Sequence, residues 1–210
     1  MRRRNAEPFP SPAGEAFARS RRSFLQTLIS AAPLLTLPLF ASVEQGAPII
    51  QGHGQIKPPA PVPDVNLICQ DGSATTLLQL VQGHGTAVQL MFTSCTTTCP
   101  IQAAIFGRVQ TKIPDMAARK LQLLSLSIDP KSDTPQAMSD WLRRFHAGPT
   151  WIAAAPAMAD APQLQGFFGR GSNTVDHSNQ VSVLDRQGRL VWRTYELPAA
   201  EEIVGILQKI

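Results

Sequence analysis

Outside its first 45 residues, this chain lacks an excess of basic charge. The formal charge of all 210 residues is +4, but residues 1–45 contain six arginines and three glutamates, which leaves 13 basic and 12 acidic residues in the remainder. A nucleic-acid-binding protein gathers Lys and Arg on its folded domain. The near-neutral remainder therefore argues against a nucleic-acid partner.

Cysteine is scarce as well, and no internal repeat is visible. The chain has three cysteines, with 43% apolar and 16% charged residues. This composition is typical of a globular domain with a hydrophobic core and excludes a disordered chain. A length of 210 residues is enough for one domain of ordinary size plus a tail.

The first 45 residues have the pattern of an export signal. Residues 20–25 read Ser-Arg-Arg-Ser-Phe-Leu, and an uncharged apolar run extends from Phe24 to Phe40. The pattern resembles a twin-arginine signal, whose export machinery moves folded proteins, with an ordinary secretory signal or membrane anchor as the alternative. The run of about 17 residues is near the lower limit for spanning a bilayer, and no clean cleavage site follows it. We therefore expect a periplasmic or cell-envelope protein, with the signal either removed or kept as an inner-membrane anchor.

Residues 46–63 are rich in proline and glycine and predict an extended linker before a domain at residues 64–210. In that domain, strands and helices alternate, and a hairpin follows. The expected strands cover 65–69, 86–92, 121–128, 150–154 and the hairpin 180–194; the expected helices cover 101–113, 135–146, 162–168 and 199–209. This order predicts an α/β fold with a mostly parallel sheet, helices on both faces and a C-terminal β-hairpin.

Two cysteines, Cys95 and Cys99, lie between a predicted buried strand and a predicted helix. This is the sheet edge where open α/β folds bind ligands. We expect Cys99 in the first turn of the helix, where the dipole favours an anion and lowers the thiol pKa. The two sulfurs can form a disulfide or bind one metal ion. A purely structural disulfide is the alternative, although closing so short a loop stabilises little.

His177 precedes the predicted hairpin. If the hairpin pairs beside the strand that leads to the cysteines, the imidazole can reach them across the sheet edge. Two thiolates and one imidazole form a soft ligand set that suits Cu(I) and accepts Cu(II), whereas zinc typically takes a fourth ligand. Asp176 is a candidate for orienting the imidazole. The third cysteine, Cys69, is expected to be a buried, unreactive thiol, with a mixed-disulfide or resolving role as the alternative.

Three motifs occur in a characteristic order along the domain. They are Met91-Phe92-Thr93-Ser94-Cys95 to Cys99-Pro100, then Leu126-Ser127-Ile128-Asp129-Pro130 with Asp133-Thr134-Pro135, then Asp176-His177-Ser178. Together they resemble the Sco/SenC family over roughly residues 61–210. The resemblance implies a thioredoxin-like fold that binds one copper ion through Cys95, Cys99 and His177. It also implies supporting roles for Asp129 and Asp176.

The same resemblance implies a function in oxidase assembly. Family members deliver copper to the copper-site subunit of a respiratory oxidase, reduce its thiols, or do both, so a metallochaperone is expected more than an enzyme. The alternative is an envelope thiol-disulfide oxidoreductase without a metal role, acting on an envelope thiol protein. The chain departs from the family at Thr96-Thr97-Thr98, where the usual loop begins with Pro-Asp. Loss of that acidic residue should ease thiolate formation and leaves the choice of target open.

Overall fold

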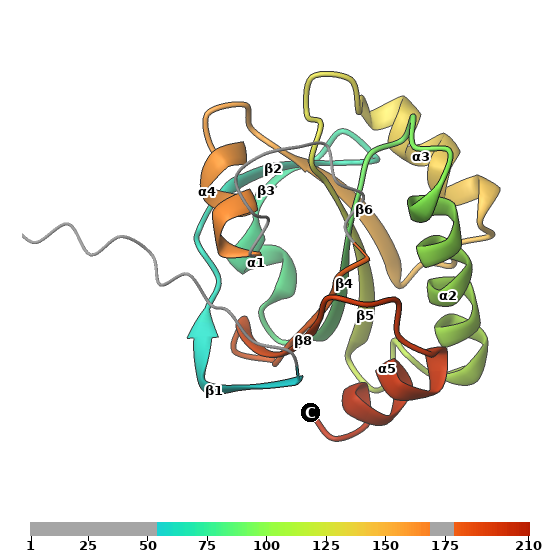
Figure 1. Cartoon of the computed structure of the whole chain (residues 1–210). Helices are drawn as coiled ribbons and strands as arrows, with labels where there is room; N and C mark the ends of the chain where they lie inside the picture. The colour runs from blue at the N-terminus through green and yellow to red at the C-terminus, as the bar shows by residue number, and fades with distance from the viewer. Residues whose placement is uncertain (1–53, 169–178) are drawn as a thin grey trace, which may run out of the picture. The chain divides into compact units, whose positions relative to one another are not determined.

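The computed structural model describes residues 54–168 and 179–210. Eight strands form one sheet in the order β1-β8-β7-β4-β5-β6-β2-β3, and five helices pack on it (Figure 1). The strands are β1 Gly54–Pro61, β2 Asn66–Cys69, β3 Ala74–Thr76, β4 Gly85–Met91, β5 Leu121–Ser127, β6 Trp151–Pro156, β7 Val181–Leu184 and β8 Arg189–Thr194. The helices are α1 Leu77–Val81, α2 Thr98–Lys112, α3 Pro135–Arg144, α4 Ala161–Phe167 and α5 Ala200–Leu207.

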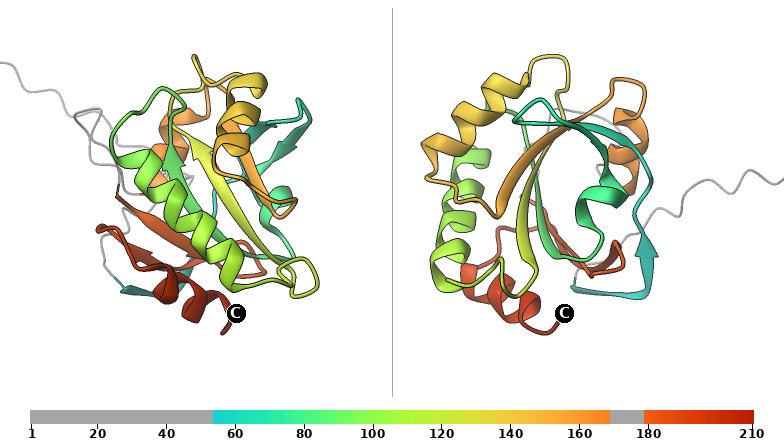
Figure 2. Two further views of the ribbon diagram at one scale, coloured as in Figure 1. Left: turned by 90° about the vertical axis from the view of Figure 1, so that its right-hand side faces the viewer. Right: turned by 180° about the vertical axis from the view of Figure 1, so that it is seen from behind.

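Helices cover both faces of the sheet, as expected. Alternate residues of a strand point to opposite faces, so Ala87 and Met91 of β4 join one core cluster while Val88 and Leu90 join the other. The first cluster contains buried residues of α2, α3 and α5, and the second contains those of α1 and α4. The left panel of Figure 2 shows α2, α3 and α5 together on the face that is turned to the viewer.

The sheet is more antiparallel than the sequence suggests. Strands β4, β5 and β6 are parallel neighbours, joined by the crossovers that contain α2 and α3. All other neighbouring strands in the sheet pair in antiparallel orientation, on both sides of these three strands. Short connections such as that between β2 and β3 permit only antiparallel pairing, because a parallel pair needs a crossover of a dozen residues or more.

The domain begins earlier than expected. Residues 54–61, predicted as linker, form β1 and pair with β8, so the linker prediction is wrong for this half of 46–63. The prolines suggested a linker, but an edge strand also tolerates proline. The outer side of an edge strand needs no hydrogen bonds to a neighbouring strand. The pairing shifts register between Gln55 and Ala60, around Pro58 and Pro59. The sheet therefore starts about ten residues before the predicted boundary at residue 64.

Strand β3 and helix α1 were not predicted. A capping box starts α1: Thr76 Oγ1 accepts a hydrogen bond from the backbone N–H of Gln79, and Gln79 Oε1 accepts one from that of Thr76, both at 3.3 Å. The Thr-x-x-Gln spacing is a known helix-start signal. A five-residue helix is too short to show a periodic pattern.

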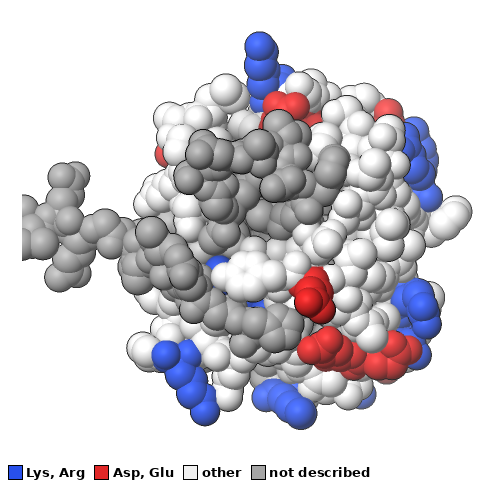
Figure 3. Space-filling model, viewed as in Figure 1, with Lys and Arg blue, Asp and Glu red and all other residues white. Residues whose placement is uncertain are grey.

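Charge is dispersed on the face of the molecule shown in Figure 3. Lys and Arg side chains are scattered around its rim, and acidic side chains gather near α5, where Glu201 pairs with Lys112 at 2.9 Å and with Arg108 at 3.8 Å. Among the described residues visible on this face, no basic patch for nucleic acid is present. Within the described ranges, no helix is both long and apolar enough to cross a membrane. The predicted export signal at residues 1–45 lies outside those ranges.

Candidate metal centre

Cys95 and Cys99 lie at the carboxyl end of β4, as predicted. Strand β4 ends at Met91, and Cys99 is the second residue of α2, which begins three residues before the predicted start. The backbone N–H of Cys99 donates to Cys95 Sγ at 3.4 Å. Both residues are thiols, 3% and 2% exposed. The loop and the first turn of α2 thus bring two buried sulfurs together at one edge of the sheet.

The expected low pKa of Cys99 is wrong. Burial, followed by the hydrogen bond with the Cys95 side chain, raises the pKa of the Cys99 thiol to about 12. Backbone hydrogen bonds from Phe92, just after β4, and from Cys99 itself lower the pKa by less. The cost of removing a thiolate from water therefore outweighs the favourable position at the helix N-terminus.

Asp133 belongs to the second sequence motif, but its supporting role at the site was not predicted. Its carboxylate is 2% exposed and accepts three hydrogen bonds: from the backbone N–H of Thr93 at 2.9 Å, from Thr93 Oγ1 at 2.7 Å and from Ser127 Oγ at 2.6 Å. It thereby ties the dithiol loop to the end of β5 and the start of α3. The cap of α3 is the next residue, Thr134, whose hydroxyl accepts from the N–H of Ala137 at 3.2 Å. The carboxylate of Asp133 is therefore available to bind Thr93 in the dithiol loop.

Asp129 lies two residues after β5, at the same edge of the sheet. Its carbonyl accepts hydrogen bonds from the N–H groups of Ser132 and Asp133, and its own N–H donates to Ser127 Oγ at 3.0 Å. Asp129 therefore shapes the turn that places Asp133. Its predicted role beside the metal stays a prediction.

Strand β7 lies directly beside β4, as the hairpin argument required. Val181 of β7 pairs with Gln89 of β4, so the start of β7 and the end of β4 share one sheet edge. Gln102, one turn after Cys99, donates from Nε2 to the carbonyl of Gln180 at 2.7 Å. Gln180 in turn donates to the carbonyl of Phe168. These bonds anchor both flanks of segment 169–178 close to the helix that carries Cys99.

His177 and Asp176 lie outside the described residues. Within the described ranges, no three His, Cys, Asp or Glu side chains are arranged to hold a metal ion. The two cysteines supply two soft sulfur donors, which fit copper better than calcium or magnesium. In the sequence, His177 is three residues before the anchored Gln180.

Cys69 is separate from this pair. It is buried on β2 opposite Ala154, in the core cluster on the other face of the sheet. Burial raises the pKa of its thiol, against a smaller lowering by a hydrogen bond with Ser73. The expected buried thiol is confirmed.

Comparison with known proteins agrees with this architecture. The SCO1/SenC family model matches residues 55–210. An SCO2-like protein of Rickettsia prowazekii is 24% identical over 155 residues, which cover 68% of this chain and 73% of that protein. The crystal structure of yeast Sco1 with copper bound has a TM-score of 0.60 at 18% identity and covers 72% of this chain and 92% of that one. BsSco, named as a member of the Sco family of cytochrome c oxidase assembly proteins, has a TM-score of 0.62 at 17% identity, with coverage of 74% and 95%.

The structural matches confirm the thioredoxin-like α/β fold. The family match confirms the resemblance carried by the cysteine, Asp-Pro and His motifs. It begins within β1 and continues to the last residue, well over half of the chain. On this ground the protein belongs to the SCO1/SenC family.

Proposed function

We propose that this protein is an exported copper-binding assembly factor that serves the copper site of a respiratory oxidase. One observation carries the proposal: two buried sulfurs, Cys95 and Cys99, lie at the sheet edge where β7 begins after the segment that contains His177. The related yeast Sco1 binds copper, and BsSco is named for oxidase assembly, which supports this assignment. One copper ion per chain, bound by the two cysteines and His177, is the expected cargo.

The residues of the chain account for the handling of such a cargo. Burial keeps the Cys99 thiol protonated at neutral pH, so copper displaces a proton when it binds. Burial also shields the sulfurs from water and from chance oxidants. A partner that offers its own thiolates can then take the ion by ligand exchange at the exposed rim formed by Ser94, Thr96 and Thr97. Asp133 holds the loop in place by its bonds to Thr93.

Reduction of a disulfide in the partner is a second reaction that the same two cysteines can carry out. Cys95 and Cys99 are four residues apart, and the N–H of Cys99 already contacts Cys95 Sγ, so one disulfide can close between them. In that reaction the two protein thiols become a disulfide, and the partner's disulfide becomes two thiols. If His177 takes no part in metal binding, the protein is a thiol-disulfide oxidoreductase of the envelope.

Copper titration of the reduced protein tests the assignment. We expect one copper per chain and, with Cu(II), a strong sulfur-to-copper absorption band. Replacing Cys95, Cys99 or His177 with Ala should weaken the band, whereas Cys69→Ala, in the other core cluster, should leave it unchanged. Binding that is indifferent to His177→Ala overturns the three-ligand site and favours the oxidoreductase.

A deletion strain separates delivery from reduction. An oxidase defect that added copper cures points to copper delivery. A defect that only a reductant cures points to thiol chemistry. The role of Asp129 and Asp176 beside the metal is tested in the same strain by complementation with their Asn variants.

Export through the twin-arginine machinery is the remaining part of the proposal. Arg21→Lys with Arg22→Lys should abolish accumulation in the periplasm or envelope, because that machinery reads the arginine pair. The matched control is Arg3→Lys with Arg4→Lys, which keeps the pair. Unchanged export of the first variant contradicts the twin-arginine route, and a change in the size of the exported protein shows whether the signal is removed.

A further inference from the structure

A pocket lies beside the dithiol loop, against one face of α3. Its volume is about 210 Å³. Its lining residues are Thr93, Ala137, Asp140, Trp141 and Arg144. The four α3 residues follow the three-and-four spacing that places side chains on one side of a helix. Thr93 precedes Cys95 by two residues, so their Cα atoms are at most about 7.6 Å apart.

The pocket has walls of mixed character: Ala137 and Trp141 are apolar, whereas Thr93, Asp140 and Arg144 are polar or charged. Trp141 is 1% exposed and packs against Phe145, with ring centroids 4.7 Å apart. Thr93 is held by its backbone N–H and its hydroxyl, both of which donate to Asp133. The wall next to the dithiol therefore keeps its place when a ligand enters.

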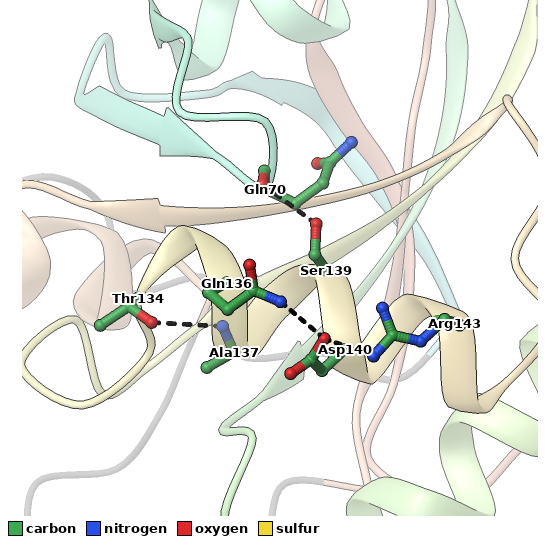
Figure 4. Close-up of polar contacts among 7 residues, drawn as sticks. All are labelled: Gln70, Thr134, Gln136, Ala137, Ser139, Asp140 and Arg143. Atoms are coloured by element: carbon green, nitrogen blue, oxygen red, sulfur yellow. Dashed lines mark hydrogen bonds and ion pairs between the residues drawn. The ribbon is translucent and has the colours of Figure 1, made fainter.

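The charges around the pocket are not balanced. Figure 4 shows Gln136 and Arg143 both directed at the carboxylate of Asp140, at 2.8 and 2.6 Å. That carboxylate is thus already neutralised from outside the pocket. Asp133, behind Thr93, is buried and accepts three hydrogen bonds. Arg144 is consequently the exposed cation of the pocket that has no ion pair among the described residues.

The dithiol loop itself offers a partner no charge. Residues 92–107 contain no Asp, Glu, Lys or Arg. Arg144 is therefore the charge that the pocket beside Thr93 contributes to an approaching chain. An acidic side chain with a short apolar stem matches these walls and this charge.

The geometry points to a docking pocket for an acidic side chain, located near the cysteines of the polypeptide that the dithiol serves. This inference rests on the proposed function, because it names a feature of that partner. In the exchange reaction, Cys95 and Cys99 are oxidised to a disulfide while the partner's disulfide is reduced to two thiols. Arg144 takes no part in the electron transfer and only holds the partner in place.

Synthetic peptides provide the test. Two peptides with one internal disulfide, identical except for Glu or Gln beside the cysteines, are mixed with the reduced full chain. We expect the Glu peptide to be reduced about two- to fivefold faster, the effect of a partly exposed charge pair. Arg144→Gln should abolish this preference, and Arg144→Glu should reverse it. High salt should also reduce it in the unaltered protein.

Arg108→Gln is the control. Arg108 is an exposed arginine of α2 that does not line the pocket, and its loss leaves the ion pair between Asp140 and Arg143 intact. Equal preference in the Arg108 and Arg144 variants, or no preference in the unaltered protein, overturns the pocket.

A second measurement keeps the two proposals apart. The same peptides with Ser in place of Cys are titrated while the indole N–H resonance of Trp141 is followed by NMR. A shift that saturates with the Glu peptide and is lost in Arg144→Gln supports the pocket even if the dithiol neither exchanges nor binds copper. Absence of that shift overturns the pocket and leaves the proposed function standing.

Discussion

At the scale of single residues, Cys99 shows two opposing influences on one thiol. Its place in the first turn of α2 favours the thiolate, but its burial raises the pKa to about 12. At pH 6–8 the thiol therefore carries its proton, and any metal that binds must release it. The protonation of this one group makes metal affinity depend on pH.

Copper affinity should rise with pH. Because the working range lies far below a pKa of about 12, each thiol proton displaced adds about a tenfold gain in apparent affinity per pH unit. Competition with a chromophoric chelator at pH 6, 7 and 8 measures the slope. Cys99→Ala should make the slope shallower by about one proton. A slope that is the same in both proteins contradicts a protonated Cys99 ligand.

Removal of Asp133 should destabilise the fold. Asp133→Ala leaves the N–H of Thr93 and the hydroxyl of Ser127 without their acceptor, at a cost of about 2–3 kcal/mol in the free energy of unfolding. Asp133→Asn keeps one acceptor oxygen and should cost about 1 kcal/mol. Urea unfolding measures both, and alkylation of Cys95 should be faster in the Ala variant. Equal stability of the two variants contradicts the role of the carboxylate in holding the loop.

Sequence reasoning found Cys95 and Cys99 but missed the roles of Asp133 and Gln102. The cysteines are recognisable because their chemistry is rare and they stand close together in the chain. Asp133 bonds to a residue 40 positions away, and Gln102 to one 78 positions away. Only the folded chain brings such partners together, so their roles cannot be read from local sequence.

At the scale of elements, the turn between β7 and β8 depends on glycine. Gly188 has a φ of +71°, and a Cβ there would lie 2.9 Å from Leu78 Cδ1 and 3.3 Å from Val81 Cγ2. Gly72, in the turn between β2 and β3, has a φ of +81° but open space around it. The two glycines thus share a backbone conformation and differ in their surroundings.

Gly188→Ala should therefore cost more than Gly72→Ala. We expect about 1 kcal/mol for Gly72→Ala from the left-handed backbone alone. Gly188→Ala should cost about 2–3 kcal/mol, because the packed side chains of Leu78 and Val81 must also shift. Thermal unfolding of both variants gives the comparison. Equal losses would show that α1 adapts without strain.

The elements that were predicted are those with a long regular pattern. The strands β4 and β5 and the amphipathic α3 are set by runs of apolar residues at fixed spacing. The missed elements, β1, β3 and α1, are proline-rich or at most five residues long. Their stability comes from pairing and packing with distant parts of the chain, which no local pattern shows.

At the scale of the whole molecule, the proposed copper binding is coupled to folding. A ligand that binds only the folded chain stabilises it by an amount set by its concentration relative to Kd. The two sulfurs come from the loop and helix that follow the central strand β4, so the site exists only when the sheet has formed. Unfolding must therefore release the ion.

Copper should accordingly raise the melting temperature. At buffered free Cu(I) of 100 times Kd, the gain is about 2.7 kcal/mol in the free energy of unfolding. Calorimetry with and without Cu(I) measures it, and His177→Ala should show a smaller gain at the same copper level. An identical gain in that variant would mean that the imidazole adds nothing to binding.

The hydrogen bond from Gln180 to the carbonyl of Phe168 has a consequence for how this protein can vary. It joins the residue before segment 169–178 to a residue shortly after it. The hydrogen bond from Gln102 then holds Gln180 against α2. The length and the sequence of the chain between those two ends can therefore change without altering the register of β7. Relatives built on this plan are thus free to evolve, and engineers to exchange, the sequence of this segment while the scaffold stays the same.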